Sequence, residues 1–470
     1  MVTEDQDAVV VGGSIAGLLA ARILADRNTF VTIVDTDELP HQPTARKGVP
    51  QSVQPHVLFT KGYRILESLF PGIAADLNAA GALTIDWPRE FHYFSRGGWS
   101  NNASAASDIV SVTCSRPLIE WAIRRRLKDF PNVRFVEAHR VTGLLASSNH
   151  ITGVRLQPLS GEGLNELPAS LVVDASGRRS NAPQWLENLG FTPPPETVVN
   201  PFLGYATRRY QEPPGFEADW KVMLISHEPP HGTRLGYLAR IEGGQWIATL
   251  GGYGRDFPPL DNDGFLAFAQ TLPSPKFYEA IALATPVSPI YAHRATANRL
   301  RHYEKVKLPQ GFVALGDAVC ALCPVYGQGM TVSALSALVL RDWLNQSKRP
   351  SRLLPNSDSK PALNAGKLLP SRFQKSLARS NALHWGMATG QDSRFLTTAG
   401  RSESGWLMGV LQWYTERLLL SANQDAAMHT FLLEIAHLLK SPLAVYHPKI
   451  VLRVLATDVR TLSQSKSSFP

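Results

Sequence analysis

Residues 8–35 read AVVVGGSIAGLLAARILADRNTFVTIVD and set the architecture of the chain. A short β-branched run is followed by a glycine turn, a segment with helical periodicity and a second β-branched run that ends in an acidic residue. This order is typical of a βαβ unit, in which two parallel strands flank a crossover helix. We therefore predict an α/β fold that begins with a parallel sheet.

The turn in this unit is a variant of the phosphate-binding motif GxGxxG, spelled GGSIAG over residues 12–17. Gly12 would permit the tight turn and Gly17 the close packing of the helix, while Ser14 replaces the middle glycine by another small residue. The helix would direct free N–H groups at a pyrophosphate. Asp35 lies 18 residues beyond Gly17, near the spacing at which an acid binds an adenosine ribose. An ordinary turn aspartate is the alternative, but the joint pattern predicts a bound dinucleotide.

A second segment of this kind comes late in the chain. GFVALGDAV begins at Gly311 and predicts a buried strand, followed by a loop and the apolar helix MTVSALSALVLRDWL. Asp317 could bind a polyol chain, and the N–H groups of the helix that opens after residues 324–329 could stabilise negative charge on a flat ring. A nicotinamide has neither a ribityl chain nor an anionic ring, so the two segments together predict FAD. An ordinary strand–loop–helix turn is the alternative.

Between these segments the pattern predicts a second sheet. FLGYATRRY, KVMLISHE, RLGYLARI and QWIATLGGY alternate in polarity and are separated by turn residues, which indicates antiparallel strands. We predict a discontinuous Rossmann-like FAD-binding domain of the glutathione-reductase type, an antiparallel-sheet substrate domain, and a C-terminal linker with a helical region. The expected boundaries are 1–80, 108–185 and 293–345 for the first, 81–107 and 186–292 for the second, and 346–470 for the third.

Charge narrows the class of partner. The 470 residues carry a net charge of +8, which would suit a phosphate-bearing cofactor, an anionic membrane surface or a nucleic acid. The densest basic run, residues 124–126, falls in a segment with helical apolar spacing, so Arg124 and Arg125 are expected to face solvent. We therefore expect a small-molecule partner and no nucleic acid.

The amino terminus, the apolar stretches and the cysteines indicate where in the cell the protein is expected. The amino terminus is acidic and unlike a signal peptide, and no late apolar stretch reaches the roughly 18 uncharged residues of a membrane span. Cys114, Cys320 and Cys323 give no disulfide framework, so we expect a cytoplasmic protein. Cys320 and Cys323 form a CxxC, for which packing of small buried residues is favoured over a redox-active dithiol. No metal site is expected.

Further motifs make a family resemblance specific. RKGVPQ at residues 46–51, His56, CSRPLIEW from Cys114 and LVVDASGR from Leu171 accompany the two nucleotide segments. Together they resemble the class A-like flavoprotein monooxygenases, and among these the FAD-dependent epoxidases of polyether biosynthesis, of the monensin and lasalocid type. The similarity includes YATRRY and NRLRHYEKV and is weakest in about the last hundred residues.

The resemblance implies how FAD would be held. The glycine turn and Asp35 would bind the ADP half, and Arg46 with Arg116 would face the pyrophosphate or ribityl chain. Asp317 would bind the ribityl chain, and Asp174 with Gly177 would belong to the second family motif. Residues 327–330 would lie under the pyrimidine edge. The expected contacts are Gly12, Gly13, Ser14, Ile15, Ala16, Gly17, Asp35, Thr36, Arg46, Lys47, Val49, Arg116, Val141, Asp174, Gly316, Asp317, Pro324, Gly327, Gln328, Gly329 and Met330.

The resemblance also implies a reaction, the insertion of one oxygen atom of O2 into a largely apolar organic substrate through a flavin C4a-hydroperoxide. Epoxidation of an alkene requires no base, and since no base dyad is evident we expect it rather than aromatic hydroxylation. A reductase or dehydrogenase of isoprenoid-like substrates and a flavin-binding protein without turnover are the alternatives. A flavin-dependent halogenase would be expected to carry a WxWxIP segment, which the chain does not contain.

The remaining predictions concern the electron donor, the catalytic residues and the substrate contacts. DASGRRS differs from the DG motif of phenol hydroxylases and no second dinucleotide fingerprint occurs, so NAD(P)H would reduce FAD directly or a separate flavin reductase would do so. Arg46 and His56 are the candidates for catalysis, although a lone histidine is more often structural. Tyr205, Arg208 and Trp246 are candidate substrate contacts on the antiparallel sheet, but alternation does not decide which face is inward.

Overall fold

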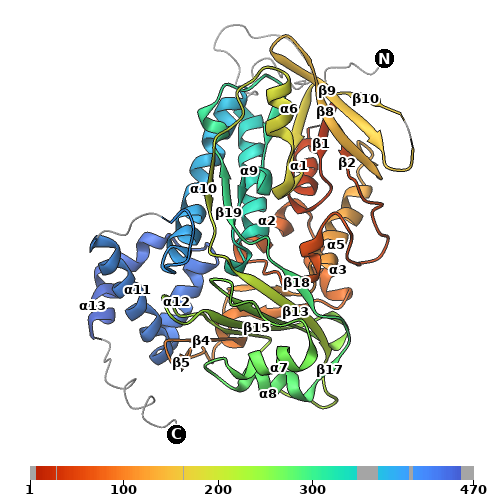
Figure 1. Ribbon diagram of the computed structural model, residues 1–470. Helices are drawn as coiled ribbons and strands as arrows, with labels where there is room; N and C mark the ends of the chain where they lie inside the picture. Colours follow the sequence, from red (N-terminus) through yellow and green to blue (C-terminus); the bar gives the residue numbers. More distant parts are fainter. Residues whose placement is uncertain (1–6, 28, 162, 347–368, 402–405, 457–470) are drawn as a thin grey trace.

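The computed structural model describes residues 7–27, 29–161, 163–346, 369–401 and 406–456 (Figure 1). Helices alternate with several sheets along the chain, which confirms the α/β class. The linker expected between about residues 345 and 370 falls mostly outside the described residues.

A parallel sheet forms one half of the molecule. The βαβ unit consists of β1 (Asp7–Val11), α1 (Ile15–Ala25) and β2 (Phe30–Val34), close to the predicted positions. The sheet has the order β20-β11-β1-β2-β7, and each neighbouring pair is parallel. Its other strands are β7 (Val133–Val136), β11 (Leu171–Asp174) and β20 (Phe312–Ala314).

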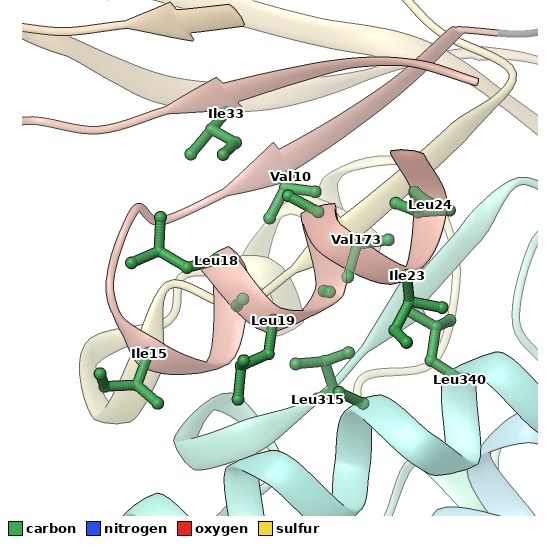
Figure 2. Close-up of a cluster of buried hydrophobic side chains, with 14 of the residues drawn as sticks. Val10, Ile15, Leu18, Leu19, Ile23, Leu24, Ile33, Val173, Leu315 and Leu340 are labelled. Atoms are coloured by element: carbon green, nitrogen blue, oxygen red, sulfur yellow. The ribbon is translucent and has the colours of Figure 1, made fainter. Parts of the chain in front are cut away.

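Helix α1 is enclosed on both sides, which explains its apolar composition. It packs between the parallel sheet and α9 (Gly329–Gln346), a helix that follows it by some three hundred residues in sequence. Figure 2 shows its side chains directed toward the strands and toward the late segment of the chain. The labelled members of this core are Val10, Ile15, Leu18, Leu19, Ile23, Leu24, Ile33, Val173, Leu315 and Leu340.

The register of the parallel sheet brings four strand ends to one edge. Val11 lies opposite Val34 on one side and Asp174 on the other, and Asp174 lies opposite Ala314. Because all these strands run in the same direction, the residues that follow them emerge together at the carboxyl edge, where α/β proteins commonly bind ligands.

A larger sheet forms the second half, with the order β17-β13-β16-β15-β14-β4-β5 and with β18 paired to β13. The predicted strands pair antiparallel, whereas β4 pairs with β14 in parallel. The reason is that β4 comes from an early excursion of the chain, whose direction neighbouring hairpins do not set. The strands are β4 (Phe91–Ser95), β5 (Gly98–Trp99), β13 (Gly204–Gln211), β14 (Val222–Ile225), β15 (Arg234–Ile241), β16 (Gln245–Gly252), β17 (Thr285–Pro286) and β18 (Tyr291–His293).

Three smaller sheets and the remaining helices complete the described chain. The smaller sheets join β8 (His139–Ser147), β9 (His150–Pro158) and β10 (Asn165–Pro168); β12 (Glu196–Val199), β19 (Asn298–Arg301) and β21 (Cys320–Ala321); and β3 (Leu83–Asp86) with β6 (Val110–Thr113). The helices are α2 (Thr60–Leu69), α3 (Ile73–Ala79), α4 (Trp87–Glu90), α5 (Arg116–Lys128), α6 (Ala182–Asn188), α7 (Asn262–Gln270), α8 (Lys276–Leu283), α10 (Pro370–Asp392), α11 (Trp406–Gln424), α12 (Ala426–Ala436) and α13 (Pro448–Ala456).

Two expectations about charge and hydropathy can be compared with the structure. Within the described ranges, every helix is too short or too polar to cross a bilayer. Arg125 is exposed on α5, but Arg124 is buried and donates a hydrogen bond to the Pro40 carbonyl oxygen, so its predicted solvent-facing position is wrong. Helical spacing predicted which face of α5 packs on the core. It could not show that residues 39–41, from another part of the chain, cover the flank that carries Arg124.

We predict that Gly17→Ala destabilises the protein by at least about 2 kcal/mol, because overpacking without room to relax has costs of this order. A Cβ atom at Gly17 would lie 1.8 Å from the Gly12 carbonyl oxygen, and both atoms belong to rigid backbone. Urea unfolding would measure the loss. Gly161→Ala is the matched control, since a Cβ atom at Gly161 would meet no other atom within 4 Å, and equal stability of the two variants would contradict the explanation.

Candidate functional site

The early glycine turn and the late glycine–aspartate turn touch each other. Gly316 has a φ of +63°, which favours glycine, and a Cβ atom there would lie 2.7 Å from the Cβ of Ala16. This contact places the turn after β20 against the first turn of α1. The segments that meet at this edge carry most of the predicted FAD contacts, namely residues 12–17, Asp35, Arg46, Arg116, residues 316–317 and residues 327–330.

The turn after β1 is shaped by its neighbours. Gly12 has a φ of +103°, and a Cβ atom there would lie 2.7 Å from the Ala175 carbonyl oxygen. The N–H of Gly13 donates to Asp35 Oδ2 at 2.7 Å, which ties the turn to the end of β2. Ser14 stands at the N-cap position of α1, but its side chain makes no capping hydrogen bond. The donors of the first helical turn are therefore not capped by this side chain.

Arg46 is the cationic centre of this edge. Its Nη1 lies 3.0 Å from Asp35 Oδ1 and 2.7 Å from Asp37 Oδ2, and its Nε lies 2.7 Å from Glu120 Oε1. Burial alone would lower the pKa of Arg46, but these carboxylates outweigh it and raise the pKa above the ordinary value. Burial raises the pKa of Asp35, with Arg46 acting in the opposite direction. Arg46 thus holds together three acidic side chains from two segments, the residues after β2 and helix α5.

Arg116 and His56 form an adjoining polar chain. Arg116 donates to Ser14 Oγ at 2.7 Å and to His56 Nε2 at 3.2 Å, while His56 Nδ1 lies 3.0 Å from the Gln54 carbonyl oxygen. These partners assign the imidazole proton to Nδ1, because Nε2 accepts from a cation. Burial and then Arg116 lower the pKa of His56 to about 3, so the ring is neutral near pH 7. Both nitrogens of His56 are already used, which leaves it no free lone pair for a catalytic base.

Asp317 lies among several cations. Burial raises the pKa of its carboxyl group, and Arg178, Arg116 and Arg299 act in the opposite direction. Arg178 itself donates to the Leu322 carbonyl oxygen at 3.0 Å, which keeps it beside the loop that follows. A carboxylate surrounded by guanidinium groups would suit a ligand that offers hydroxyl donors and phosphate acceptors in the same region.

The loop before α9, residues 324–328, and Gly329 at the start of that helix leave room for a flat group. Gly327 has a φ of +65°, and a Cβ atom on Gly329 would meet no atom within 4 Å. Two buried polar atoms near these segments have no hydrogen-bond partner within the described chain, Oε1 of Gln328 and Nε of Arg116. Open space beside glycine together with unpaired donors and acceptors indicates a site for a polar ligand.

Five of the predicted FAD contacts differ in how far they are exposed to solvent. Thr36 and Lys47 are exposed, whereas Val49 and Val141 are buried. Asp174 is fully buried and accepts hydrogen bonds from the backbone and hydroxyl of Ser176 and from Ser180 Oγ at 2.5 Å. The carboxylate of Asp174 therefore stabilises the turn after β11.

The structure separates the three candidate substrate contacts. Tyr205 lies on the face of β13 that carries Thr207, whose hydroxyl donates to Gln54 beside the site. Arg208 lies on the opposite face, and Trp246 packs there with the aromatic cluster under α7 and α8. Strand alternation thus places Arg208 and Trp246 on the face of the sheet opposite Tyr205 and Thr207.

A buried carboxylate that the sequence did not indicate lies beside the same loop. Asp392, at the end of α10, accepts hydrogen bonds from the Tyr326 hydroxyl at 2.6 Å, the Asn298 amide at 2.6 Å and the Tyr253 hydroxyl at 3.4 Å. Asn298 Oδ1 in turn accepts from the backbone N–H of Cys323 at 2.7 Å. Both ends of the segment 323–326 are thus connected to one carboxylate on α10.

Sequence analysis missed both Glu120 and Asp392, but only Glu120 had a recognisable pattern in the sequence. Glu120 follows Arg116 by four residues on a predicted helix, a spacing that places the two side chains on one face. Asp392 offered no such signal, because its partners Asn298 and Tyr326 lie 94 and 66 residues away in sequence. Only folding brings these groups together.

We predict that the contribution of Asp392 to stability declines as pH rises. Burial raises its pKa to about 6, above the ordinary value of 3.8, so this contribution is complete below about pH 3.8 and is lost as pH rises through about 6. The change corresponds to roughly 3 kcal/mol. The difference in unfolding free energy between wild type and Asp392→Asn, followed from pH 4 to 8, would measure it. A constant difference would contradict the raised pKa.

The cysteines pack in separate clusters, and all three are buried and free. Cys320 lies with Leu322 and Val332, whereas Cys323 lies with Tyr205 and other aromatic residues. Burial raises the pKa of the Cys320 thiol to about 12, which suppresses the reactive thiolate. The described residues contain no cluster of three or more His, Cys, Asp or Glu side chains arranged to hold a metal ion.

Oxidised protein should therefore still contain three free thiols. We expect the native protein to react slowly with a thiol reagent, because all three sulfur atoms are buried, and the denatured protein to release three equivalents. Detection of one equivalent in the denatured, non-reduced protein would instead support a Cys320–Cys323 dithiol that cycles with its disulfide.

Comparisons with known proteins agree with this architecture. No family model matches the chain. A triple mutant of the flavin-dependent brominase Bmp2 has a TM-score of 0.64 at 13% identity, covering 98% of this chain and 100% of that one. PqsL, described as a probable FAD-dependent monooxygenase from Pseudomonas aeruginosa, has a TM-score of 0.55 at 17% identity, covering 83% and 97%. At these identities the likeness shows the fold.

A relative in Mycobacterium tuberculosis (strain ATCC 25618 / H37Rv) is much more similar in sequence. Protein Rv3254 is 35% identical over 351 residues, which cover 71% of this chain and 72% of that protein. Such identity over so much of both chains shows common family membership, and the chain therefore belongs to the same family as Rv3254.

Proposed function

We propose that the chain is an FAD-dependent monooxygenase that acts on a largely apolar small molecule. The observation that carries the proposal is the contact of Gly316 with Ala16, which joins the two predicted halves of a dinucleotide site. The residues present fit FAD: helix α1 begins without a side-chain cap, Asp317 lies among arginines, and space is open beside Gly329. The similar folds of a flavin-dependent brominase and a probable FAD-dependent monooxygenase support the same cofactor.

Each part of the site would hold a different part of the cofactor. The first turn of α1 would bind the pyrophosphate, and Asp35 the ribose of the ADP half, in a Rossmann-like arrangement. Arg116 would neutralise phosphate charge through its unpaired Nε, and Asp317 would bind ribityl hydroxyls. The backbone at Gly327 and Gly329 would lie against the flavin ring, and a Cβ atom at Gly329 would meet no other protein atom within 4 Å.

When bound, reduced FAD supplies the activation of O2 from which one oxygen atom is transferred. The chain's own residues would orient the substrate and exclude water. Tyr205, Leu235 and Phe395 belong to one buried apolar cluster that packs against Val325 and Tyr326 of the loop before α9. Such a cluster would provide the dry wall that oxygen transfer requires.

We further propose epoxidation of an alkene as the reaction, in line with the resemblance to polyether epoxidases. His56 is neutral and fully hydrogen-bonded, and Asp392 is occupied by three donors, so neither is free to remove a phenolic proton. A reduced nicotinamide would supply the electrons, directly or through a separate flavin reductase. Halogenation is the second candidate, because a brominase shares the fold, although the chain lacks the WxWxIP segment.

Cofactor binding can be tested with Gly329→Leu. A Cβ atom at Gly329 would meet no atom within 4 Å, so the apoprotein of this variant should fold normally while its FAD affinity falls at least tenfold. Flavin fluorescence titration would measure the affinity, and thermal melting would confirm folding. Gly161→Leu is the control, and it should bind FAD like the wild type. A colourless wild-type protein that does not bind FAD would refute the proposed function.

The reaction itself can be tested with isotopic oxygen. FAD-loaded protein, a reduced nicotinamide, a flavin reductase and 18O2 should convert an alkene to a product that carries one 18O atom, as seen by mass spectrometry. Bromide added to the same mixture distinguishes the second candidate. A brominated product without oxygen transfer would replace monooxygenation by halogenation.

A further inference from the structure

A groove of about 400 Å³ runs between helices α10 and α11. Its lining combines apolar residues with Gln391, Arg394, Gln412 and Thr415, and Cβ atoms at Gly386 and Gly390 would meet nothing within 4 Å. Pockets of a few hundred Å³ are typical of sites for small organic molecules. The apolar walls are formed by Leu383, Gly386, Met387, Gly390, Leu411 and Tyr446.

One end of this groove carries an excess of positive charge. Arg394 lines the groove, and its Nη2 lies 2.6 Å from Glu416 Oε1. Nη2 of Arg96 lies at the same distance from the same oxygen atom, so two guanidinium groups share one carboxylate. The side chain of Arg394 is only 8% exposed, and that of Arg96 is 20% exposed. The cluster therefore retains one positive charge in a region with little water to screen it.

The backbone around this cluster is also unusual. Arg96 has a φ of +52°, in the left-handed region that side chains other than glycine seldom adopt. It lies in the short turn between β4 and β5, and its guanidinium reaches across to α11. Strained residues of this kind occur disproportionately at ligand sites.

The charged end of the groove adjoins the proposed flavin site. Arg394 follows Asp392 by two residues. Asp392 in turn accepts a hydrogen bond from the hydroxyl of Tyr326 in the loop before α9. The ring of His227 lies tilted against Tyr253, another partner of Asp392, with 4.6 Å between the ring centroids. Burial, followed by Arg394 and Arg96, lowers the pKa of His227 to about 3, which indicates that both arginines act on this cluster. A ligand bound at Arg394 would thus end beside the loop.

We propose that the groove between α10 and α11 binds an amphipathic carboxylate, with its apolar body along Gly386 and Gly390 and its anionic end at Arg394 and Arg96. This goes beyond the proposed function, because it adds a ligand site whose charged end adjoins the loop before α9. An arginine fork matches a carboxylate in geometry, and the apolar walls match a hydrocarbon chain. The alternative is an ion-pair cluster that only joins the turn after β4 to α11.

Calorimetric titration of the full chain, with and without saturating FAD, would test the proposal with decanoate and the neutral decan-1-ol at pH 8. Decanoate should bind at least tenfold more tightly than decan-1-ol. Arg394→Met should abolish this preference, whereas Arg372→Met, on the exposed first turn of α10, should preserve it. Gly386→Leu should weaken the binding of both ligands at least tenfold, while the melting temperature of the variant does not fall.

Glu416→Gln provides a test that misfolding cannot mimic. Glutamine still accepts hydrogen bonds from both arginines but leaves their charge uncompensated, so decanoate should bind several-fold more tightly than to wild type. Equal binding of decanoate and decan-1-ol, unchanged binding to Gly386→Leu, or no gain in Glu416→Gln would overturn the proposal. FAD affinity measured in the same samples distinguishes the two claims, since a wild type that binds decanoate but no FAD would refute only the proposed function.

Discussion

The arrangement of the site depends on the close packing of α1 between the parallel sheet and the segment that follows β20. Three glycines make this packing possible: Gly17 against the backbone of Gly12, Gly12 against Ala175, and Gly316 against Ala16. Side chains at these positions would force rigid backbones apart. Because the strand ends share one edge, this packing also brings segments separated by about three hundred residues to the same place.

The second constraint is the compensation of buried charge. Arg46 contacts Asp35, Asp37 and Glu120, and Arg116 contacts Ser14 and His56, so nearly every charged group at this edge already has a partner within the protein. Removing one member of such a network leaves an uncompensated charge, which is far more costly than the net value of the pair. The network therefore fixes side-chain positions before a ligand arrives, and preorganised positions reduce the cost of binding.

The C-terminal region connects several parts of the fold to one another. Asp392 connects α10 to both ends of the segment 323–326, and two residues later Arg394 meets Glu416 of α11 and, through it, Arg96 of the large sheet. One short piece of chain after α10 thus joins the loop, the sheet and the last helices. The C-terminal region in this way connects the proposed cofactor site to the proposed ligand groove.

The sequence by itself determined the βαβ unit, the glycine turns and the class of fold, because strand and helix periods and glycine geometry are local properties that residues 8–35 and 311–330 carry in full. Only the tertiary structure decided the parallel pairing of β4 with β14, the burial of Arg124, the face on which Tyr205 lies and the assembly of Asp392 with Tyr326 and Asn298. The physical reason is that these features arise from contacts between segments distant in the chain, and local patterns carry no information about which distant partner will cover a given face.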